Sequence, residues 1–411
     1  MFELIRANQR RAAVLVVGMA VLLFAAGYAL GELLQPGAGL LGLAGAGAVW
    51  TVMTLLAWFQ GDRILLSASG ARRIQKQDHP VLWNVVEEMC IAAGLPQMPD
   101  VYIIDEDAPN AFATGREPER SAVAVTAGLL ERLSRDELQG VIAHELGHVK
   151  NRDVLYMTMI GIMMGTIVML ADIGVRALWY GGGRRRTSSN RDGGGGQAIV
   201  MLVALVLIVL APLLARLMYL ALSRRREYLA DASSALFTRY PEGLASALEK
   251  ISASGIPLRA ANRATAPMYI VNPLKVVGQR LANLSSTHPA TSDRVQILRS
   301  LGGGAEISLA RYDDAFRKVT HRAVGVVPAG SLVAAETLAA RGTGAPDPRS
   351  HVDRVRETTD ALWRLQNYAF VSCPCGTTLK VPPEQAGREI PCPHCDRELR
   401  VASITANSAV R

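Results

Sequence analysis

Residues 141–153 read VIAHELGHVKNRD and place two histidines four positions apart, with a glutamate directly after the first. Ser134 followed by Glu137 matches a capping box, and the apolar residues after it recur at helical spacing, so we expect a helix here. On that helix, His144 and His148 project from one face, one turn apart. Two imidazoles in this arrangement can bind one Zn²⁺ at about 2.0–2.1 Å.

Glu145 lies one residue further round this helix, beside a bound metal rather than on it. From there a carboxylate can take a proton from a water molecule whose pKa the zinc ion lowers to about 7. The alternative for this stretch is a pair of solvated or core histidines on an amphipathic helix. A third ligand elsewhere in the chain favours the metal site over that alternative.

The third ligand should come from a separate helix, because two imidazoles do not fill a zinc coordination shell. Glu227, within SRRREYLADASSA (residues 223–235), is the best candidate. Asp231, one turn later, can accept the other N–H of a ligating histidine and so fix its tautomer. The alternative is a charged collar beside a membrane helix, in which Glu227 only pairs with Arg224.

The composition indicates a membrane protein. Half of the 411 residues are hydrophobic but only 5% are aromatic, which favours lipid-facing aliphatic sequence over a large soluble core. The net charge is +8, but the arginines cluster beside apolar runs without an aromatic-basic platform, so we expect a lipid bilayer and no nucleic acid as partner. Four stretches approach the roughly 20 apolar residues that cross a bilayer: residues 13–31, 40–59, 154–171 and 198–215.

The first two stretches predict a transmembrane hairpin, and the last two either span or form a shallower hairpin packed on the first pair. If all four cross, the basic groups at residues 6–11, 63–76 and 224–226 share one side, which the positive-inside rule makes cytoplasmic. Four arginines in the glycine- and serine-rich residues 181–196 would then lie outside and oppose this orientation. His148 and Glu227 lie about six and about twelve residues from the nearest apolar stretch, so the metal site should lie close to the membrane surface.

Four motifs, interleaved with the apolar stretches, resemble the HtpX-type membrane metalloproteases, relatives of the CAAX prenyl proteases. They are HELGHVKNRD (144–153), SRRREYLADASSA (223–235), PNAFATG (109–115) and STHPATSDRV (286–295). The resemblance covers residues 1–325 and implies a mainly α, gluzincin-type α+β metalloprotease domain with a small edge-exposed sheet. It implies a zinc endopeptidase of the inner (plasma) membrane that cleaves misfolded or damaged membrane proteins at the cytoplasmic face. His144, His148 and Glu227 match the zinc ligands, and Glu145 matches the catalytic glutamate.

The same resemblance also assigns the edge strand to which a substrate would bind. The substrate-facing edge strand matches Asn110, Ala111, Phe112, Ala113, Thr114 and Gly115. An edge strand suits a protease of many substrates because it binds backbone, although the stretch alone is equally a plain turn and strand. His288 can donate to the oxyanion, or it is a structural histidine, and Arg294 can pair with a carboxylate such as Asp231. The family more often has a second proline where this chain has Ala290.

A second metal site is predicted near the C-terminus. The four cysteines form one Cys-x-Cys and one Cys-x₂-Cys pair: Cys373, Cys375, Cys392 and Cys395. In a reducing compartment this spacing favours a structural zinc over disulfides. The unit resembles a zinc ribbon with an unusually tight first knuckle; the alternatives are redox chemistry and a remnant that binds no metal.

Other segments complete the expected organisation. Residues 79–95 predict an amphipathic helix, residues 101–105 and 121–130 are strand-like, and one long helix should run from the fourth apolar stretch to about residue 237. The expected parts are a transmembrane hairpin (1–60), a metalloprotease domain (61–325) interrupted by a second hairpin (about 154–222), a linker (326–361) and the ribbon-like unit (362–411).

Two other functions are compatible with these motifs. One is a non-catalytic zinc-binding membrane adaptor, against which the intact Glu145 argues, because a structural zinc needs no neighbouring base. The other is a protease of prenylated proteins that works inside the membrane, for which four spans are too few to enclose a large chamber.

Overall fold

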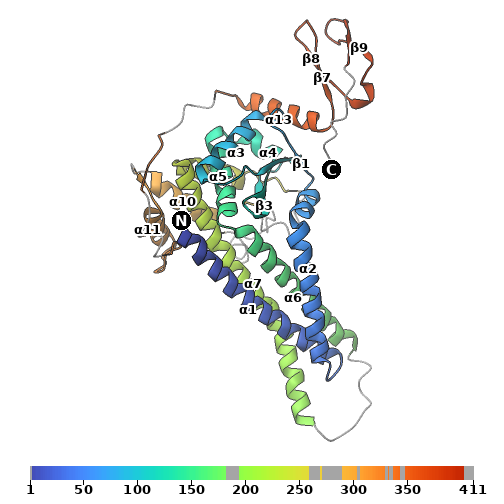
Figure 1. The fold of residues 1–411 in the computed structure, drawn as a ribbon, viewed down its shortest axis with the longest axis vertical. Helices are drawn as coiled ribbons and strands as arrows, with labels where there is room; N and C mark the ends of the chain where they lie inside the picture. Colours follow the sequence, from blue (N-terminus) through green and yellow to red (C-terminus); the bar gives the residue numbers. More distant parts are fainter. Residues whose placement is uncertain are drawn as a thin grey trace.

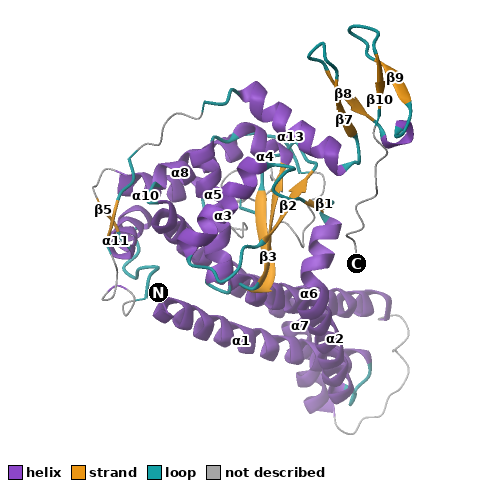
Figure 2. Ribbon diagram, turned by 45° about the horizontal axis from the view of Figure 1, so that its top comes forward, coloured by secondary structure: helices purple, strands orange, loops and turns teal. Residues whose placement is uncertain are grey.

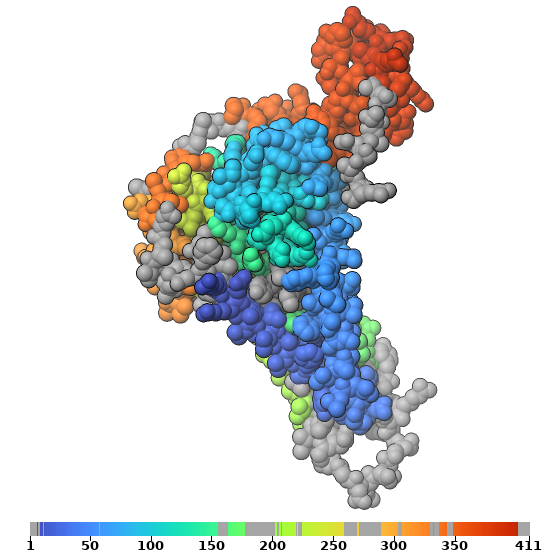
Figure 3. All heavy atoms as spheres, in the orientation of Figure 1, coloured from blue at the N-terminus to red at the C-terminus, as the bar shows by residue number. Residues whose placement is uncertain are grey.

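The computed structural model describes residues 2–181, 194–258, 269–270, 289–302, 306–328, 332, 337–342 and 348–401. Figure 1 shows a long helical bundle with a mixed α/β domain at one end. The bundle consists of α1 (Phe2–Leu34), α2 (Gly39–Ala68), α6 (Asp153–Gly181) and α7 (Gly194–Thr238). A small C-terminal unit, red in Figure 3, stands out from the α/β domain.

The four bundle helices share one buried apolar cluster, to which each contributes: Met19 and Leu23 from α1, Ala46 from α2, Met163 from α6 and Ala211 from α7. By length and composition, two described stretches can cross a membrane, Ala12–Leu34 and Gly39–Leu56, and Ile208–Met218 is a shorter apolar stretch. The first two predicted spans therefore lie in helices of spanning length. The third and fourth lie in α6 and α7, and residues 182–193 of the predicted arginine-bearing loop lie outside the described residues.

A four-stranded sheet forms the centre of the α/β domain. Its strands are β1 (Ala71–Arg73), β2 (Asp100–Ile104), β3 (Ala111–Glu117) and β4 (Arg120–Thr126), in the order β1-β2-β4-β3. β2 and β4 run parallel, with Val101 beside Val123, whereas β3 pairs antiparallel with β4, with Phe112 beside Ala124. β3 is therefore an edge strand of this sheet.

The predicted strand at residues 121–130 is too long. It ends at Thr126, and residues 127–130 begin α4 (Ala127–Arg132). The reason is a helix cap, since the Thr126 side chain accepts a hydrogen bond from the Leu129 N–H. The strand predicted at residues 101–105 is confirmed as β2, and the short edge strand β1 was not predicted.

Helices cover one face of the sheet (Figure 2). They are α3 (Pro80–Ala93) and α5 (Arg135–Lys150), followed outward by α8 (Pro241–Ala253), α10 (Thr291–Gly302) and α11 (Leu309–Thr320). The predicted capping box of Ser134 and Glu137 starts α5. α5 approaches α8 very closely, because a Cβ on Gly140 would lie 2.6 Å from the Leu244 nitrogen. Next to α11, β5 (Glu306–Ile307) pairs with β6 (Leu338–Ala339).

α7 is a single helix of 45 residues, as the sequence predicts, and it runs from the bundle into the α/β domain. It therefore joins the apolar bundle directly to the domain core, where Tyr228 and Leu229 are buried with residues of α3 and α5. This continuity determines where Glu227 lies.

The predicted linker at residues 326–361 is wrong in its last part, which forms α13 (His351–Leu365). Ser350 and Asp353 make a capping box that starts this helix, and Arg354 donates a hydrogen bond to the Glu131 carbonyl on α4 (3.3 Å). Beyond α13, the C-terminal unit consists of two hairpins: β7 (Ala369–Ser372) with β8 (Thr378–Val381), and β9 (Glu389–Pro391) with β10 (Glu398–Arg400).

Candidate active site

The three side chains predicted to bind metal converge between α5 and α7. His144 Nε2 lies 3.7 Å from one Glu227 carboxylate oxygen, and His148 Nε2 lies 3.5 Å from the other. Tetrahedral zinc with bonds of about 2.0–2.1 Å holds its ligand atoms about 3.4 Å apart. His144 Nε2 is also buried with no hydrogen-bond partner in the described part of the chain, as expected of a nitrogen that faces a metal. The donor set therefore fits one zinc ion.

His144 is held in the orientation that a metal ligand needs. Its Nδ1 donates a hydrogen bond to Asp231 (2.9 Å), which leaves Nε2 directed toward His148 and Glu227. Burial lowers the pKa of His144 to about 4, although Asp231 opposes the shift. The ring is therefore neutral at pH 7 and able to bind a metal.

Arg294, fully buried on α10, supports this arrangement from behind. It donates from Nε (2.8 Å) and Nη2 (2.7 Å) to the two oxygens of Asp231, and its Nη1 lies 3.3 Å from Glu227. Burial alone would raise the pKa of Asp231, but Arg294 and the hydrogen bond with His144 outweigh it, so this pKa is lowered. Asp231 therefore remains charged, and it connects Arg294 to His144.

A second carboxylate–arginine pair, which the sequence reasoning missed, supports His148. Asp153 lies 3.2 Å from His148 Nδ1, and its other oxygen forms an ion pair with Arg226 Nε at 2.9 Å. Asp153 and Arg226 are both buried. The chain turns sharply between α5 and α6, with Arg152 in the left-handed region (φ 55°), and this turn brings Asp153 back to His148. Two features of the sequence could have indicated this pair: Asp153 follows His148 by five residues, and Arg226 directly precedes Glu227.

Glu145 faces the edge strand from α5. Its side chain is buried, and it accepts a hydrogen bond from the backbone of Ala113 on β3. Burial raises the pKa of Glu145 to about 7, and the nearby Glu227 adds to this effect, whereas His148 opposes it. A carboxylate with a pKa near neutrality is suited to take up and release a proton at physiological pH.

The predicted substrate-binding stretch forms β3 and the residue before it. Asn110 O accepts a hydrogen bond from β4, whereas Ala111 O accepts one from the Ile270 N–H (3.1 Å) on the other side. Backbone groups alternate along an antiparallel strand, so Ala113 and Gly115 also direct their N–H and C=O groups to the outer edge. Gly115 has a φ of 122° at a bulge in β3, a conformation that favours glycine. Phe112 and Thr114 pair with β4 instead.

One predicted site residue, His288, lies outside the described residues. Its neighbours Pro289 and Ala290 precede α10, the helix that carries Arg294. The structure therefore brings together every other predicted residue of the metal site.

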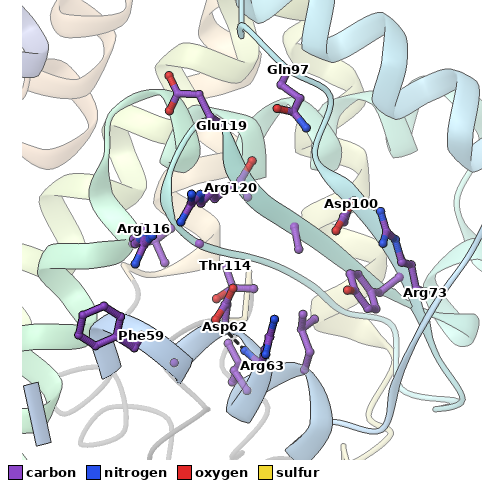
Figure 4. A pocket seen from close by; sticks show the side chains of 18 of the residues that line it. Phe59, Asp62, Arg63, Arg73, Gln97, Asp100, Thr114, Arg116, Glu119 and Arg120 are labelled. Atoms are coloured by element: carbon purple, nitrogen blue, oxygen red, sulfur yellow. Dashed lines mark hydrogen bonds and ion pairs between the residues drawn. The ribbon is translucent and has the colours of Figure 1, made fainter. Parts of the chain in front are cut away.

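A separate cavity of about 630 Å³ lies on the face of the sheet opposite α5 (Figure 4). It is bounded by the last turns of α2 and the β3–β4 hairpin, and its rim carries Arg63, Arg116 and Arg120 together with Asp62 and Glu119. None of the metal-site residues lines it. Although this cavity is well formed, the predicted metal-binding side chains lie elsewhere, on α5 and α7.

The four C-terminal cysteines also converge. The Sγ atoms of Cys373 and Cys395 are 3.5 Å apart, those of Cys375 and Cys392 are 3.7 Å apart, and all four are free thiols within 4.8 Å of one another. Zinc–sulfur bonds of about 2.3 Å place tetrahedral sulfur ligands about 3.8 Å apart. The thiols therefore have the spacing of a four-cysteine zinc site despite the tight first knuckle.

Comparison with known proteins assigns this geometry to a family. Residues 76–301, more than half of the chain, match the sequence model of peptidase family M48. The chain belongs to this family. It is 45% identical to the protease HtpX homologue of Dictyoglomus thermophilum over 301 residues, which are 73% of this chain and 95% of that protein. It is 43% identical to the protease HtpX homologue of Lactobacillus acidophilus over 304 residues, 73% of this chain and all of that protein.

Among solved structures, Ste24p of S. mikatae aligns with a TM-score of 0.41 and 16% identity, covering 72% of this chain and 67% of that one. The resemblance to the HtpX-type proteases is confirmed by the family match and by the identities to the curated relatives. This M48 chain is therefore a zinc metallopeptidase, and a protease rather than an adaptor.

Asp153 provides a first prediction for this peptidase. Asp153→Asn removes the charge that orients His148 and should weaken zinc binding by about 10- to 100-fold. Competition for zinc with a chromophoric chelator measures the change. Asp172→Asn, at an exposed carboxylate further along α6, is the matched control and should leave the affinity unaltered. Equal affinities of the Asp153→Asn protein and the unmodified protein would show that His148 needs no such support.

Proposed function

We propose that the chain is a multi-pass protein of the inner (plasma) membrane that cleaves misfolded or damaged membrane proteins, with its active site facing the cytoplasm. One observation carries this proposal. His148 lies on α5 two residues before that helix ends, α6 begins at Asp153, and Glu227 lies on α7, so the metal site adjoins the start of one bundle helix and takes a side chain from another. A site in that position meets substrates where they leave a bilayer.

The outer surface of the bundle supports insertion of all four helices. Each helix carries exposed apolar side chains, for example Val14 on α1, Leu41 on α2, Val168 on α6 and Leu202 on α7. Soluble monomers rarely expose a continuous apolar surface of this kind. We therefore propose that α6 and α7 span the membrane together with α1 and α2.

Basic residues support the cytoplasmic orientation. Arg6 and Arg10 precede the apolar part of α1, Arg72 and Arg73 follow α2, and the arginines at residues 224–226 lie where α7 enters the α/β domain. All three groups therefore lie at the end of the bundle that carries the metal site. By the positive-inside rule, that end is cytoplasmic.

For the chemistry, we propose His144, His148 and Glu227 as the zinc ligands and Glu145 as the base. Zinc, when bound, supplies a Lewis acid that polarises the scissile carbonyl and makes water more acidic. Glu145 takes the proton of the attacking water and passes it to the leaving amine. His288 would donate a hydrogen bond to the developing oxyanion. Asp231 and Arg294 hold His144 in place throughout.

Substrate binding is proposed to use the edge strand. A polypeptide that adds to the outer edge of β3 can pair with the Ala113 carbonyl and with the backbone groups of Gly115, and this pairing is independent of its side chains. The Ala113 N–H already contacts Glu145, so a strand bound here would lie directly beside the base. Such binding suits unfolded chains of varied sequence.

Two measurements test this proposal. The purified protein, reconstituted in proteoliposomes, should cleave an unfolded, unprenylated segment tethered to a membrane helix; cleavage of only the prenylated form would favour the prenyl-protein alternative. In a chain whose native cysteines are serines, Glu119→Cys on the exposed β3–β4 turn should react with an impermeant maleimide in inverted vesicles. Labelling in intact spheroplasts instead would reverse the orientation.

We also propose that residues 362–411 form a unit held by a second, structural zinc at the four cysteines. Cys392→Ser should then remove one equivalent of zinc per chain while peptide hydrolysis continues, because the cluster is separate from the metal centre on α5 and α7. Zinc content and hydrolysis of a short peptide are measured in parallel. The control Cys90→Ser, at a buried cysteine of α3, should keep both zinc equivalents. Unchanged zinc content in the Cys392→Ser protein would rule out the second site.

A further inference from the structure

A second charged cavity lies where α7 leaves the bundle. Its volume is about 680 Å³, and it is lined by α7, by Phe316 of α11 and by the turn that follows α11. Its lining includes basic and apolar side chains: Leu217, Leu220, Arg224 and Arg225 of α7, and Arg322 and Val324 of the turn. Neither the metal site nor the proposed substrate strand contributes to it.

The polar half of this cavity is basic. Arg224, Arg225 and Arg322 line it, and no aspartate or glutamate does so within the described part of the chain. Asp313, a carboxylate behind the turn, is buried, forms an ion pair with Arg317 (3.2 Å) and accepts a hydrogen bond from the Val327 N–H (2.8 Å). The cavity thus presents positive charge to whatever enters it, unlike the cavity in Figure 4, whose rim has both signs.

The turn is held in place against α7. Arg225 donates hydrogen bonds to the carbonyls of Gly325 (3.4 Å) and Val326 (2.6 Å). At the start of the turn, His321 ends α11 in the left-handed conformation (φ 53°). The cavity is therefore a formed feature of the domain rather than a gap beside a loose loop.

The other half of the cavity is apolar and faces the bundle. Leu217 precedes the arginines by two turns of α7 and is exposed, and Val324 is 73% exposed at the tip of the turn. α11 lies beside the N-terminal end of α1 in both ribbon views (Figures 1 and 2), and the apolar stretch Ala12–Leu34 follows further along that helix. The cavity therefore spans the boundary between apolar and basic surface at the level of a membrane interface.

From this arrangement we infer that the cavity binds an anionic phospholipid. The headgroup phosphate lies between Arg224 and Arg322, whose planar guanidinium groups suit phosphate oxygens, and an acyl chain follows Leu217 and Leu220 along α7. Basic pockets beside membrane helices on the cytoplasmic side recognise acidic headgroups in this way. The inference rests on the proposed insertion of α7 into the membrane, but not on proteolysis.

Native mass spectrometry of the delipidated full-length protein in neutral detergent tests this site. The protein is titrated with phosphatidylglycerol and with phosphatidylcholine that carries the same acyl chains. We expect the unmodified protein to bind one phosphatidylglycerol tightly. Each arginine removed should lower this affinity by about fivefold, first in Arg322→Gln and again in the double variant Arg224→Gln/Arg322→Gln. Phosphatidylcholine binding should be equal in all variants.

The control is Lys318→Gln, which removes an exposed charge from α11 that does not line the cavity, and it should bind phosphatidylglycerol as the unmodified protein does. Glycerol 3-phosphate in excess should not displace the lipid, because the apolar half contributes to binding. Equal affinity of the unmodified protein for both lipids would overturn the inference. So would a phosphatidylglycerol affinity of Arg322→Gln equal to that of the unmodified protein. Displacement by glycerol 3-phosphate would overturn it as well, because the ligand would then be a soluble phosphate. Peptide hydrolysis by Arg322→Gln should persist, which separates loss of this site from misfolding and from failure of the protease assignment.

Discussion

Replacing Glu145 by glutamine should lower kcat for an unfolded polypeptide by about 10²- to 10⁴-fold, while the zinc content stays near that of the unmodified protein. The amide has nearly the same size and can still accept the Ala113 hydrogen bond, but it cannot take a proton. The three side chains proposed as ligands remain in place. Steady-state cleavage assays and zinc analysis of the same preparation measure both effects.

Glu249→Gln is the matched control, because it removes an exposed carboxylate from α8, outside the metal site. It should leave both turnover and zinc content unchanged. If Glu145→Gln retained full turnover, the proton transfer would have to use another group. If it lost zinc instead, Glu145 would be needed for metal binding, and its proposed role would be wrong.

Removing Arg294 should have the largest effect on stability. Its side chain is only 1% exposed and forms an ion pair with both Asp231 and Glu227. Arg294→Met leaves the buried Asp231 carboxylate without its partner, and loss of one member of a buried pair costs about 3–5 kcal/mol. We expect a marked fall of the thermal midpoint in detergent and weaker zinc binding, because Asp231 would no longer hold His144.

Arg299 on the same helix provides the comparison. It pairs with Glu242 and Glu249, but its side chain is 45% exposed, so water screens these interactions. Arg299→Met should therefore leave the thermal midpoint and zinc affinity close to those of the unmodified protein. Equal losses in the two variants would mean that the contacts of Arg294 with Asp231 and Glu227 are not what stabilises the site.

The sequence predicted the parts of the fold that depend on local patterns. Short stretches of sequence reveal three of these features: the capping box before α5, the spacing of His144 and His148, and the absence of glycine and proline from residues 216–238 at the end of α7. Pairing Glu227 with these histidines needed the further requirement that zinc has a third ligand. Resemblance to a family then supplied the substrate-binding role of β3, which local patterns alone describe as a plain turn and strand.

Other features depend on contacts between distant segments, which one sequence does not reveal. No role was predicted for Asp153 from the sequence, and only the turn at Arg152 brings it to His148 and Arg226. α13 was hidden by the glycine- and proline-rich residues before it, although Ser350 and Asp353 carried its cap. β1 is three residues long and is defined only by its pairing with β2.

Zinc K-edge X-ray absorption spectroscopy of the purified protein identifies the atoms that bind the metal. In a chain whose four C-terminal cysteines are serines, we predict one zinc ion with two imidazoles and oxygen ligands at about 2.0–2.1 Å. In the same background, Glu227→Ala should lose most of that zinc. A spectrum without two imidazoles, or full zinc occupancy after Glu227→Ala, would contradict the metal centre on which the proposed hydrolysis depends.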